Sequence, residues 1–123
     1  MKVVSSLKQI LFEYDASRDG GAIGNYLSGA FSPLFCFGAI MQMIVLDPFV
    51  GGAGALISFG VTSNPILING PLDPTALIPG VIYPIPVNIL FFTSEELITA
   101  VTVNNFTAGV MAINIIFTEP VIT

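Results

Sequence analysis

The chain has 123 residues, of which 54% are hydrophobic and only 9% are charged, and its net charge is −5. So acidic a composition excludes the clustered basic side chains that hold nucleic-acid phosphates, and the absence of histidine excludes imidazole bases, Ser-His-Asp triads and most zinc sites. The single cysteine, Cys36, cannot form an internal disulfide. The length predicts one domain, residues 1–123, with a sizeable core.

The first third of the chain predicts two strands. Residues 1–8 are interpreted as an N-terminal arm, because their apolar run is too short for a secretory signal peptide. From position 8 onward, Ile10, Phe12 and Tyr14 recur at every second position, which indicates a strand with one apolar face. The Asp-Gly-Gly sequence at 19–21 breaks this strand, and residues 22–27 are predicted to pair back onto it.

The segment 30–46 is apolar enough to raise the alternative of a membrane span. It has about 17 residues, the lower limit for crossing a bilayer. It contains Pro33, Gly38 and Gln42, and no Lys or Arg near either end would orient it. These features argue against a membrane span. The segment instead predicts a strand over 36–46 that is buried in part on both faces and is ended by Pro48, which lacks a backbone donor.

The middle of the chain predicts a glycine loop, a strand and a long connection. The loop at 51–54 lacks the lysine of a P-loop and the spacing of a dinucleotide site, so it does not indicate a cofactor. Residues 55–61 are predicted as a strand. Residues 62–86 hold six of the nine prolines and are interpreted as an ordered Pro-rich connection, with one helical turn capped by Asp73 and started by Pro74. We predict that this connection contributes interface residues, namely Ile66, Leu67, Ile68 and Leu72.

The last third predicts a short strand at 87–92 and then two strands at 97–103 and 111–117. We interpret the latter two as a hairpin whose turn uses Asn104, Asn105 and Gly109. The residues predicted to face the core are Val101, Ile113, Ile115 and Phe117. Residues 118–123 are interpreted as a C-terminal arm. About seven or eight strands with one long crossover predict an all-β fold, an antiparallel β-sandwich of the Greek-key or jelly-roll kind.

No constellation of residues in the chain indicates catalysis, and we predict no enzyme, cofactor or metal. The adjacent carboxylates Glu95 and Glu96 would point to opposite faces of a strand, so they cannot act together on one substrate. Asp15 and Asp19 could supply oxygen ligands for a weak Ca²⁺ site, which we keep as a minor alternative. A structural role is the first hypothesis.

Short motifs along residues 12–117 resemble a known class of proteins. The motifs are Tyr14-Asp15 followed by DGGAIG at 19–24, ISFGVT at 57–62, ITA at 98–100 and TAG at 107–109. In this order they resemble small β-sandwich virion proteins of tailed bacteriophages, which are often head decoration or cement proteins. The resemblance implies a non-enzymatic structural protein of the virion, assembled in the host cytoplasm, whose partners are the shell of the major capsid protein and copies of itself, most simply as a homotrimer.

Two other functions remain open from the sequence. A tail or fibre adhesin module is one, although the absence of Trp and the presence of only three Tyr argue against carbohydrate stacking. A small membrane protein is the other. For a decoration protein or an adhesin module, the high apolar content of the chain favours permanent interfaces with other proteins, because soluble monomers rarely expose apolar patches above a few hundred Å².

Overall fold

The computed structural model describes residues 3–122, with side-chain burial described for residues 8–118. Residues 1, 2 and 123 of the two predicted arms lie outside the described residues. The described part of the chain is built of eight strands, one short helix and one 3-10 turn. They are β1 (Val3–Asp15), α1 (Ala16–Asp19), β2 (Gly24–Phe31), β3 (Cys36–Gly51), β4 (Leu56–Val61), β5 (Asn64–Leu72), η1 (Pro74–Ala76), β6 (Ile82–Phe91), β7 (Glu96–Thr102) and β8 (Phe106–Ile122).

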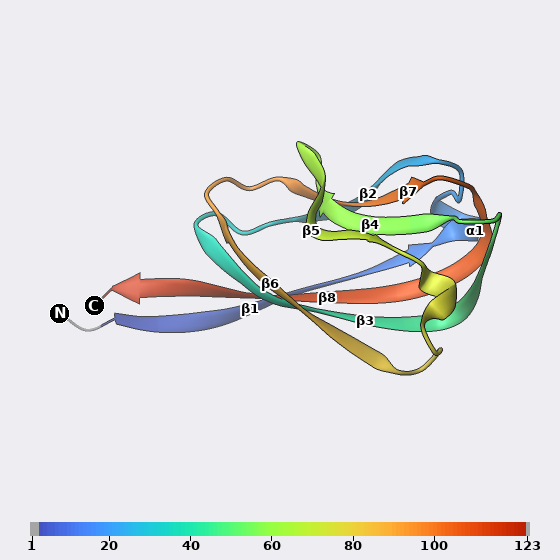
Figure 1. Cartoon of the computed structure of the whole chain (residues 1–123). Helices are drawn as coiled ribbons and strands as arrows, with labels where there is room; N and C mark the ends of the chain where they lie inside the picture. The colour runs from blue at the N-terminus through green and yellow to red at the C-terminus, as the bar shows by residue number, and fades with distance from the viewer. Residues whose placement is uncertain (1–2, 123) are drawn as a thin grey trace.

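The strands form two antiparallel sheets that face each other (Figure 1). Sheet A has the order β1-β8-β3-β6, and sheet B has the order β2-β7-β4-β5. The pairs β1·β8, β2·β7, β3·β6 and β4·β5 are nested from the ends of the chain inwards, as in one long hairpin rolled up on itself. This is the strand connectivity of a jelly roll, so the predicted all-β sandwich is confirmed.

Two predicted strand pairings are wrong. The segment 97–117 is not a hairpin, because β7 lies in sheet B and β8 in sheet A, and the turn at 103–105 carries the chain from one sheet to the other. Likewise β2 pairs with β7 rather than with β1. Alternating apolar residues indicate which face of a strand is buried, and both strands of each wrongly predicted pair bury a face in the same core.

Strand β3 is longer than predicted. It continues through Pro48 to Gly51, whereas the sequence predicted that pairing would end at Pro48. The ladder between β3 and β8 shifts register between Asp47 and Val50, and Pro48 lies within this irregular stretch. A proline is tolerated there because a bulge leaves residues of one strand outside the ladder.

The Pro-rich segment differs from the predicted connection in a similar way. Most of it forms β5 and β6, which are edge strands of the two sheets. An edge strand needs backbone donors on one side only, so it tolerates proline where a central strand does not. The helical turn is confirmed as η1, in which Pro74 is the first residue and the Asp73 carboxylate accepts a hydrogen bond from the Thr75 amide at 3.0 Å.

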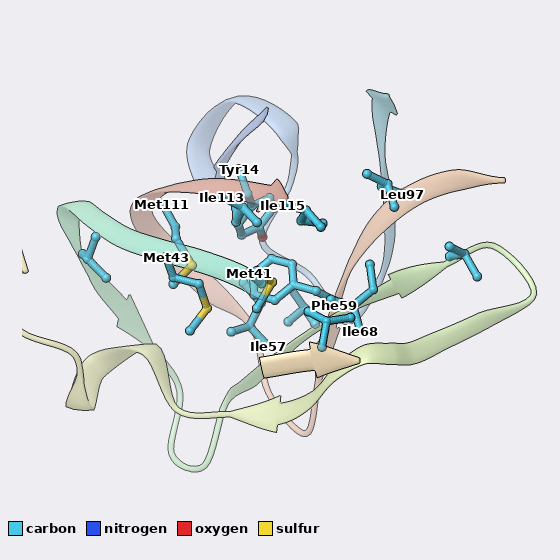
Figure 2. Packing of buried hydrophobic residues seen from close by; sticks show 14 of the residues in the cluster. Tyr14, Met41, Met43, Ile57, Phe59, Ile68, Leu97, Met111, Ile113 and Ile115 are labelled. Carbon is cyan, nitrogen blue, oxygen red and sulfur yellow. The ribbon is translucent and has the colours of Figure 1, made fainter. Parts of the chain in front are cut away.

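The core lies between the two sheets (Figure 2). Sheet A contributes Ile113, Ile115 and Phe117 from β8, each with no exposed surface, together with methionines of β3. Sheet B contributes Val101 of β7, which is 1% exposed, and side chains of β4. Figure 2 labels Tyr14, Met41, Met43, Ile57, Phe59, Ile68, Leu97, Met111, Ile113 and Ile115 within this cluster.

Residues 30–46, for which a membrane span was considered, form the end of β2, a turn and much of β3. Among the described residues, no helix has the length and apolar character needed to cross a bilayer.

Val103, in the turn between β7 and β8, has a positive φ of 72° although it is β-branched and exposed. This conformation costs an L-residue roughly 1–2 kcal/mol, and asparagine adopts it more readily. We therefore expect Val103→Asn to raise the free energy of unfolding by about 1 kcal/mol in urea titrations. The control is Val50→Asn, at a similarly exposed position of β3, where the loss of a strand-forming residue should lower it. A destabilising Val103→Asn would contradict the strain at this turn.

Candidate docking surface

The carboxylates that drew attention in the sequence all have structural partners. Glu95 Oε1 accepts a hydrogen bond from the Ser63 amide at 3.2 Å, and Glu96 Oε2 accepts one from the Gly29 amide at 2.9 Å. Each therefore holds a different loop. Among the described residues, no group of three or more His, Cys, Asp or Glu side chains is placed to hold a metal ion.

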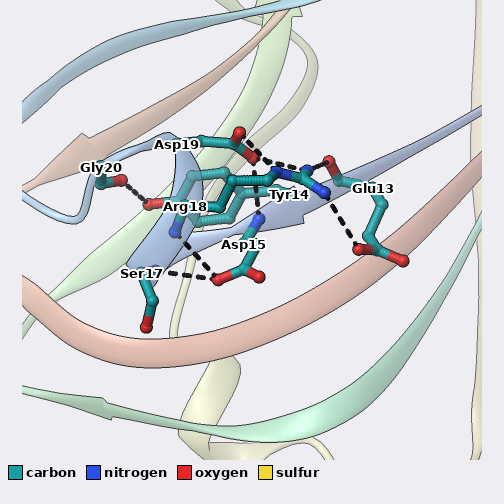
Figure 3. A network of polar contacts seen from close by, with 7 residues as sticks. All are labelled: Glu13, Tyr14, Asp15, Ser17, Arg18, Asp19 and Gly20. Carbon is teal, nitrogen blue, oxygen red and sulfur yellow. Dashed lines mark hydrogen bonds and ion pairs between the residues drawn. The ribbon is translucent and has the colours of Figure 1, made fainter.

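Asp15 and Asp19, the minor Ca²⁺ alternative, belong to a polar network around α1 (Figure 3). The Asp15 carboxylate caps α1 by accepting from the amides of Ser17 and Arg18, and Asp19 forms two bonds with the Arg18 guanidinium, each 2.9 Å long. The hydrogen bond from Arg18 lowers the pKa of Asp19 below its ordinary value. Burial raises the pKa of Tyr14, whose hydroxyl donates to the Gly20 carbonyl at 2.5 Å. These groups stabilise a corner of the fold.

The lowered pKa of Asp19 predicts a pH-dependent contribution to stability. A carboxyl with a lower pKa in the folded state stabilises the fold above its unfolded pKa of about 3.9, and this contribution is lost as the pH falls through the folded value. We expect Asp19→Asn to lower the free energy of unfolding by less than about 1 kcal/mol at pH 7, since the pair is largely exposed. Urea titrations should show this difference shrinking below pH 4. A difference that grew on acidification would refute the role of Asp19.

The feature that stands out is the outer face of sheet A, which is the side turned away from the core. Leu11 of β1 and Ile82 of β6 lie on it and are 71% and 59% exposed. Their position follows from the strand registers, in which core-facing and outward-facing residues alternate. Other apolar members of this face are Ile40 and Ile44 of β3, Ala112 and Ile116 of β8, Pro84 and Pro86 of β6, and, where β3 begins and β6 ends, Phe37 and Leu90.

A short row of amide side chains crosses this apolar face. Asn114 of β8 donates through Nδ2 to Oε1 of Gln42 on β3 at 3.1 Å and to Oε1 of Gln9 on β1 at 3.4 Å. These two bonds use both hydrogens of Nδ2. The other amide atom, Asn114 Oδ1, is buried and has no hydrogen-bond partner among the described residues. An unpaired buried acceptor costs roughly 1–3 kcal/mol.

Asn114 also lines a hollow in the outer face of sheet A. The hollow has a volume of about 170 Å³. One water occupies about 30 Å³ of liquid volume, so the hollow is wide enough to admit a side chain. Its walls are formed by Leu11, Gln42, Met43, Ile44, Ile82, Ala112 and Asn114. An apolar hollow with one unpaired acceptor at its wall suits a partner that brings apolar atoms and one hydrogen-bond donor.

If Asn114 Oδ1 is unpaired in the isolated protein, replacing this amide should cost little. We expect Asn114→Leu to unfold at the same urea concentration as the parent or a higher one, because it removes the unpaired acceptor while Gln9 and Gln42 can still bond water. The control is Ile113→Asp at the neighbouring, fully buried position, which should cost several kcal/mol. A loss above about 1 kcal/mol in Asn114→Leu would mean that the amide row stabilises the monomer.

The predicted interface residues of the Pro-rich segment fall into three environments. Ile66 is 55% exposed, Leu67 and Leu72 are half-buried, and Ile68 is only 5% exposed and belongs to the core. Ile68 is therefore a correction to the prediction, because its side chain faces inwards from β5. Leu72 lines a cleft of about 530 Å³ between β5, η1 and β6, whose walls also include Met43 and Tyr83.

Sequence reasoning missed the outer face of sheet A. A signal was present: β3 and β8 carry apolar residues at positions of both parities, such as Ile40 and Ile44 beside Met41 and Met43. For residues 36–46 that pattern was interpreted as a strand buried in part on both faces. In the structure the outward-facing apolar side chains, such as Ile40 and Ile44, are only partly buried. A partly buried apolar face is typical of a surface that contacts another protein.

Neither a protein-family model nor a curated protein sequence matches this chain. Two solved structures resemble it along most of its length. A chain in the capsid asymmetric unit of cyanophage Pam1 matches with a TM-score of 0.72 and 9% identity, covering 94% of this chain and 86% of that one. A chain of the acid-stable capsid of Helicobacter pylori bacteriophage KHP30 matches with a TM-score of 0.64 and 10% identity, covering 99% of this chain and 100% of that one. At these identities the likeness concerns the fold.

Proposed function

We propose that this protein is a non-enzymatic structural component of a bacteriophage capsid and acts as a head decoration, or cement, protein. It would dock on the shell of the major capsid protein through the outer face of sheet A. The observation that carries the proposal is the whole-length match of its jelly roll to two chains found in phage capsids. Both chains are covered almost end to end by this one, so the matched proteins are small and consist largely of this sandwich.

The surface of the protein supports a role in permanent contacts. Its accessible surface is 6289 Å², close to the roughly 6,300 Å² expected for a compact monomer of this mass. Sixteen large hydrophobic side chains are nevertheless exposed among the residues whose burial is described. The exposed apolar area therefore reflects the apolar composition of the sequence rather than an extended shape. A partner surface would remove these side chains from water.

The proposed assembly includes copies of the same chain. A homotrimer is the expected form, because icosahedral shells offer local three-fold positions and because the sequence resembles decoration proteins. The exposed Ile66 and the cleft lined by Leu72 are the proposed contacts between copies. Light scattering of the purified protein measures the number of copies directly, and a stable monomer would contradict this part of the proposal.

Docking can be tested with one charge on each sheet. Ile82→Glu places a carboxylate on the outer face of sheet A, whereas Leu27→Glu places it on β2 of sheet B at a similar exposure. We expect Ile82→Glu to lose binding to particles that lack the protein, by about tenfold or more, since a charge buried at an apolar interface costs over 1.4 kcal/mol. Leu27→Glu should bind as the parent does. Equal binding by both variants would exclude this face as the docking surface.

The location in the virion is a separate measurement. Mass spectrometry of separated heads and tails from purified particles should find the protein with the heads. Recovery with the tails would replace the decoration proposal by the adhesin alternative.

A further inference from the structure

Three of the four sheet edges of this sandwich carry features that prevent further strand pairing. The ladder from β2 to β7 breaks after Leu27 and resumes only at Phe31, and Gly29 within the break has a φ of 79°. The edge strands β5 and β6 contain two prolines each, and their ladders also shift register. These prolines are Pro65 and Pro71 in β5 and Pro84 and Pro86 in β6. Bulges and prolines are the usual protection of a sheet edge.

The fourth edge, β1, has neither a bulge nor a proline, and its one charged residue between positions 3 and 11 is Lys8. Its register with β8 runs without a shift from Val3 to Asp15, and it contains no proline. In sheet A it has a strand neighbour on one side only, which is β8. A straight strand of this length with one unpaired side is the form of edge that accepts another strand.

The α1 network closes one end of this edge. Arg18 Nη2 donates to the Glu13 carbonyl at 3.0 Å, and the Asp15 amide donates to Asp19 Oδ2 at 3.0 Å. In an antiparallel strand the amide and carbonyl of one residue point to the same side, and successive residues alternate. Glu13 and Asp15 therefore show that odd-numbered residues of β1 turn their backbone groups away from β8. The part of the edge not closed by α1 is residues 3–11.

The open stretch extends beyond the sandwich. Phe37 of β3 pairs with Thr118 of β8, and beyond this point Ser6 to Val3 of β1 pair only with residues 119–122 of β8. The two strands project together from the body as a ribbon (Figure 1). A two-stranded ribbon is marginally stable in water, whereas three or more strands are stable with a packed face. The ribbon is therefore the part of sheet A whose stability would increase most if another strand paired with it.

We propose that the open stretch of β1 pairs antiparallel with the same stretch of a second copy of this chain. The second copy is the fitting occupant, because an antiparallel two-fold contact uses one surface twice and both open stretches then have equal length. Full pairing of residues 3–11 sets the register: Leu7 lies opposite Leu7, and Ser5 lies opposite Gln9. Sheet A becomes one eight-stranded sheet across the two copies, with each ribbon part of a four-stranded unit. In a capsid layer, the contact would join neighbouring trimers pairwise.

Cross-linking in solution tests the register without any viral particle. In the proposed pair, directly opposed residues have Cα atoms about 5.5 Å apart, within the range of a disulfide. Leu7→Cys should therefore give a covalent dimer under mild oxidation, and a mixture of Ser5→Cys and Gln9→Cys should give a heterodimer. Glu13→Cys is the matched control on the same strand, because its two copies would lie about 40 Å apart. The parent sets the baseline, since Cys36 is fully buried.

A dimer from Leu7→Cys that exceeds both Glu13→Cys and the parent supports the proposal. Equal yields from Leu7→Cys and Glu13→Cys, or no dimer from either, would overturn it. The result does not depend on where the protein resides in a virion, so it can fail while the capsid proposal stands, and the reverse.

A second variant separates pairing from folding. Gln9→Pro removes an amide on the open side of β1 and leaves the bonds to β8 in place, whereas Gln9→Ala keeps that amide. We expect sedimentation velocity to show concentration-dependent doubling in mass for the parent and Gln9→Ala, and about a tenfold weaker association for Gln9→Pro. Circular dichroism should report folded protein in all three. A folded Gln9→Pro that associates as strongly as Gln9→Ala would refute the β1 contact.

Discussion

Strand β8 is the element on which the sandwich depends. It pairs with β1 on one side and β3 on the other, so sheet A exists only where β8 is in register with both. Its core-facing side chains, Met111 to Phe117 at every second position, have no exposed surface and pack against sheet B. A shift by one residue would turn these side chains outwards and bring Asn114 into the core, so burial itself selects the register.

Glycine allows β8 to pass close to the aromatic cluster at one end of the core. Gly109 lies under the Phe49 ring, and a Cβ at this position would collide with that ring. Phe49 in turn packs edge-on against Phe106, with ring centroids 5.3 Å apart, and is stacked with Tyr14 at 6.3 Å. Gly109 was interpreted from the sequence as a turn residue, and the structure instead places it within a strand where an aromatic ring needs the space.

The sequence predicted the strands of this fold better than their partners. The period of two in β1 and β8 and the turn at Asp73 are local signals, and both were interpreted correctly. Strand pairing is a long-range property. Of the four nested pairs, only β4·β5 joins strands that follow each other in the chain. Local alternation of apolar residues therefore could not distinguish a hairpin from a crossover between sheets. Edge position explains the prolines of β5 and β6, and edge position is also invisible in a local pattern. The outer face of sheet A was missed for the same reason, because Ile40 and Ile44 become surface residues only once β3 has its neighbours.

The pairing of Val3 with Ile122 has a consequence for how the protein folds. Contacts so distant in sequence are slow to form, because the entropy cost of closing the loop between them comes before the contact contributes any stability. The compact β4·β5 hairpin is local and can form early. Before β1 has paired with β8, one edge of β8 is unpaired, and a strand from another molecule could pair there in place of β1. Strand exchange between copies is therefore the characteristic misfolding hazard of this topology, most acute when many chains are synthesised together.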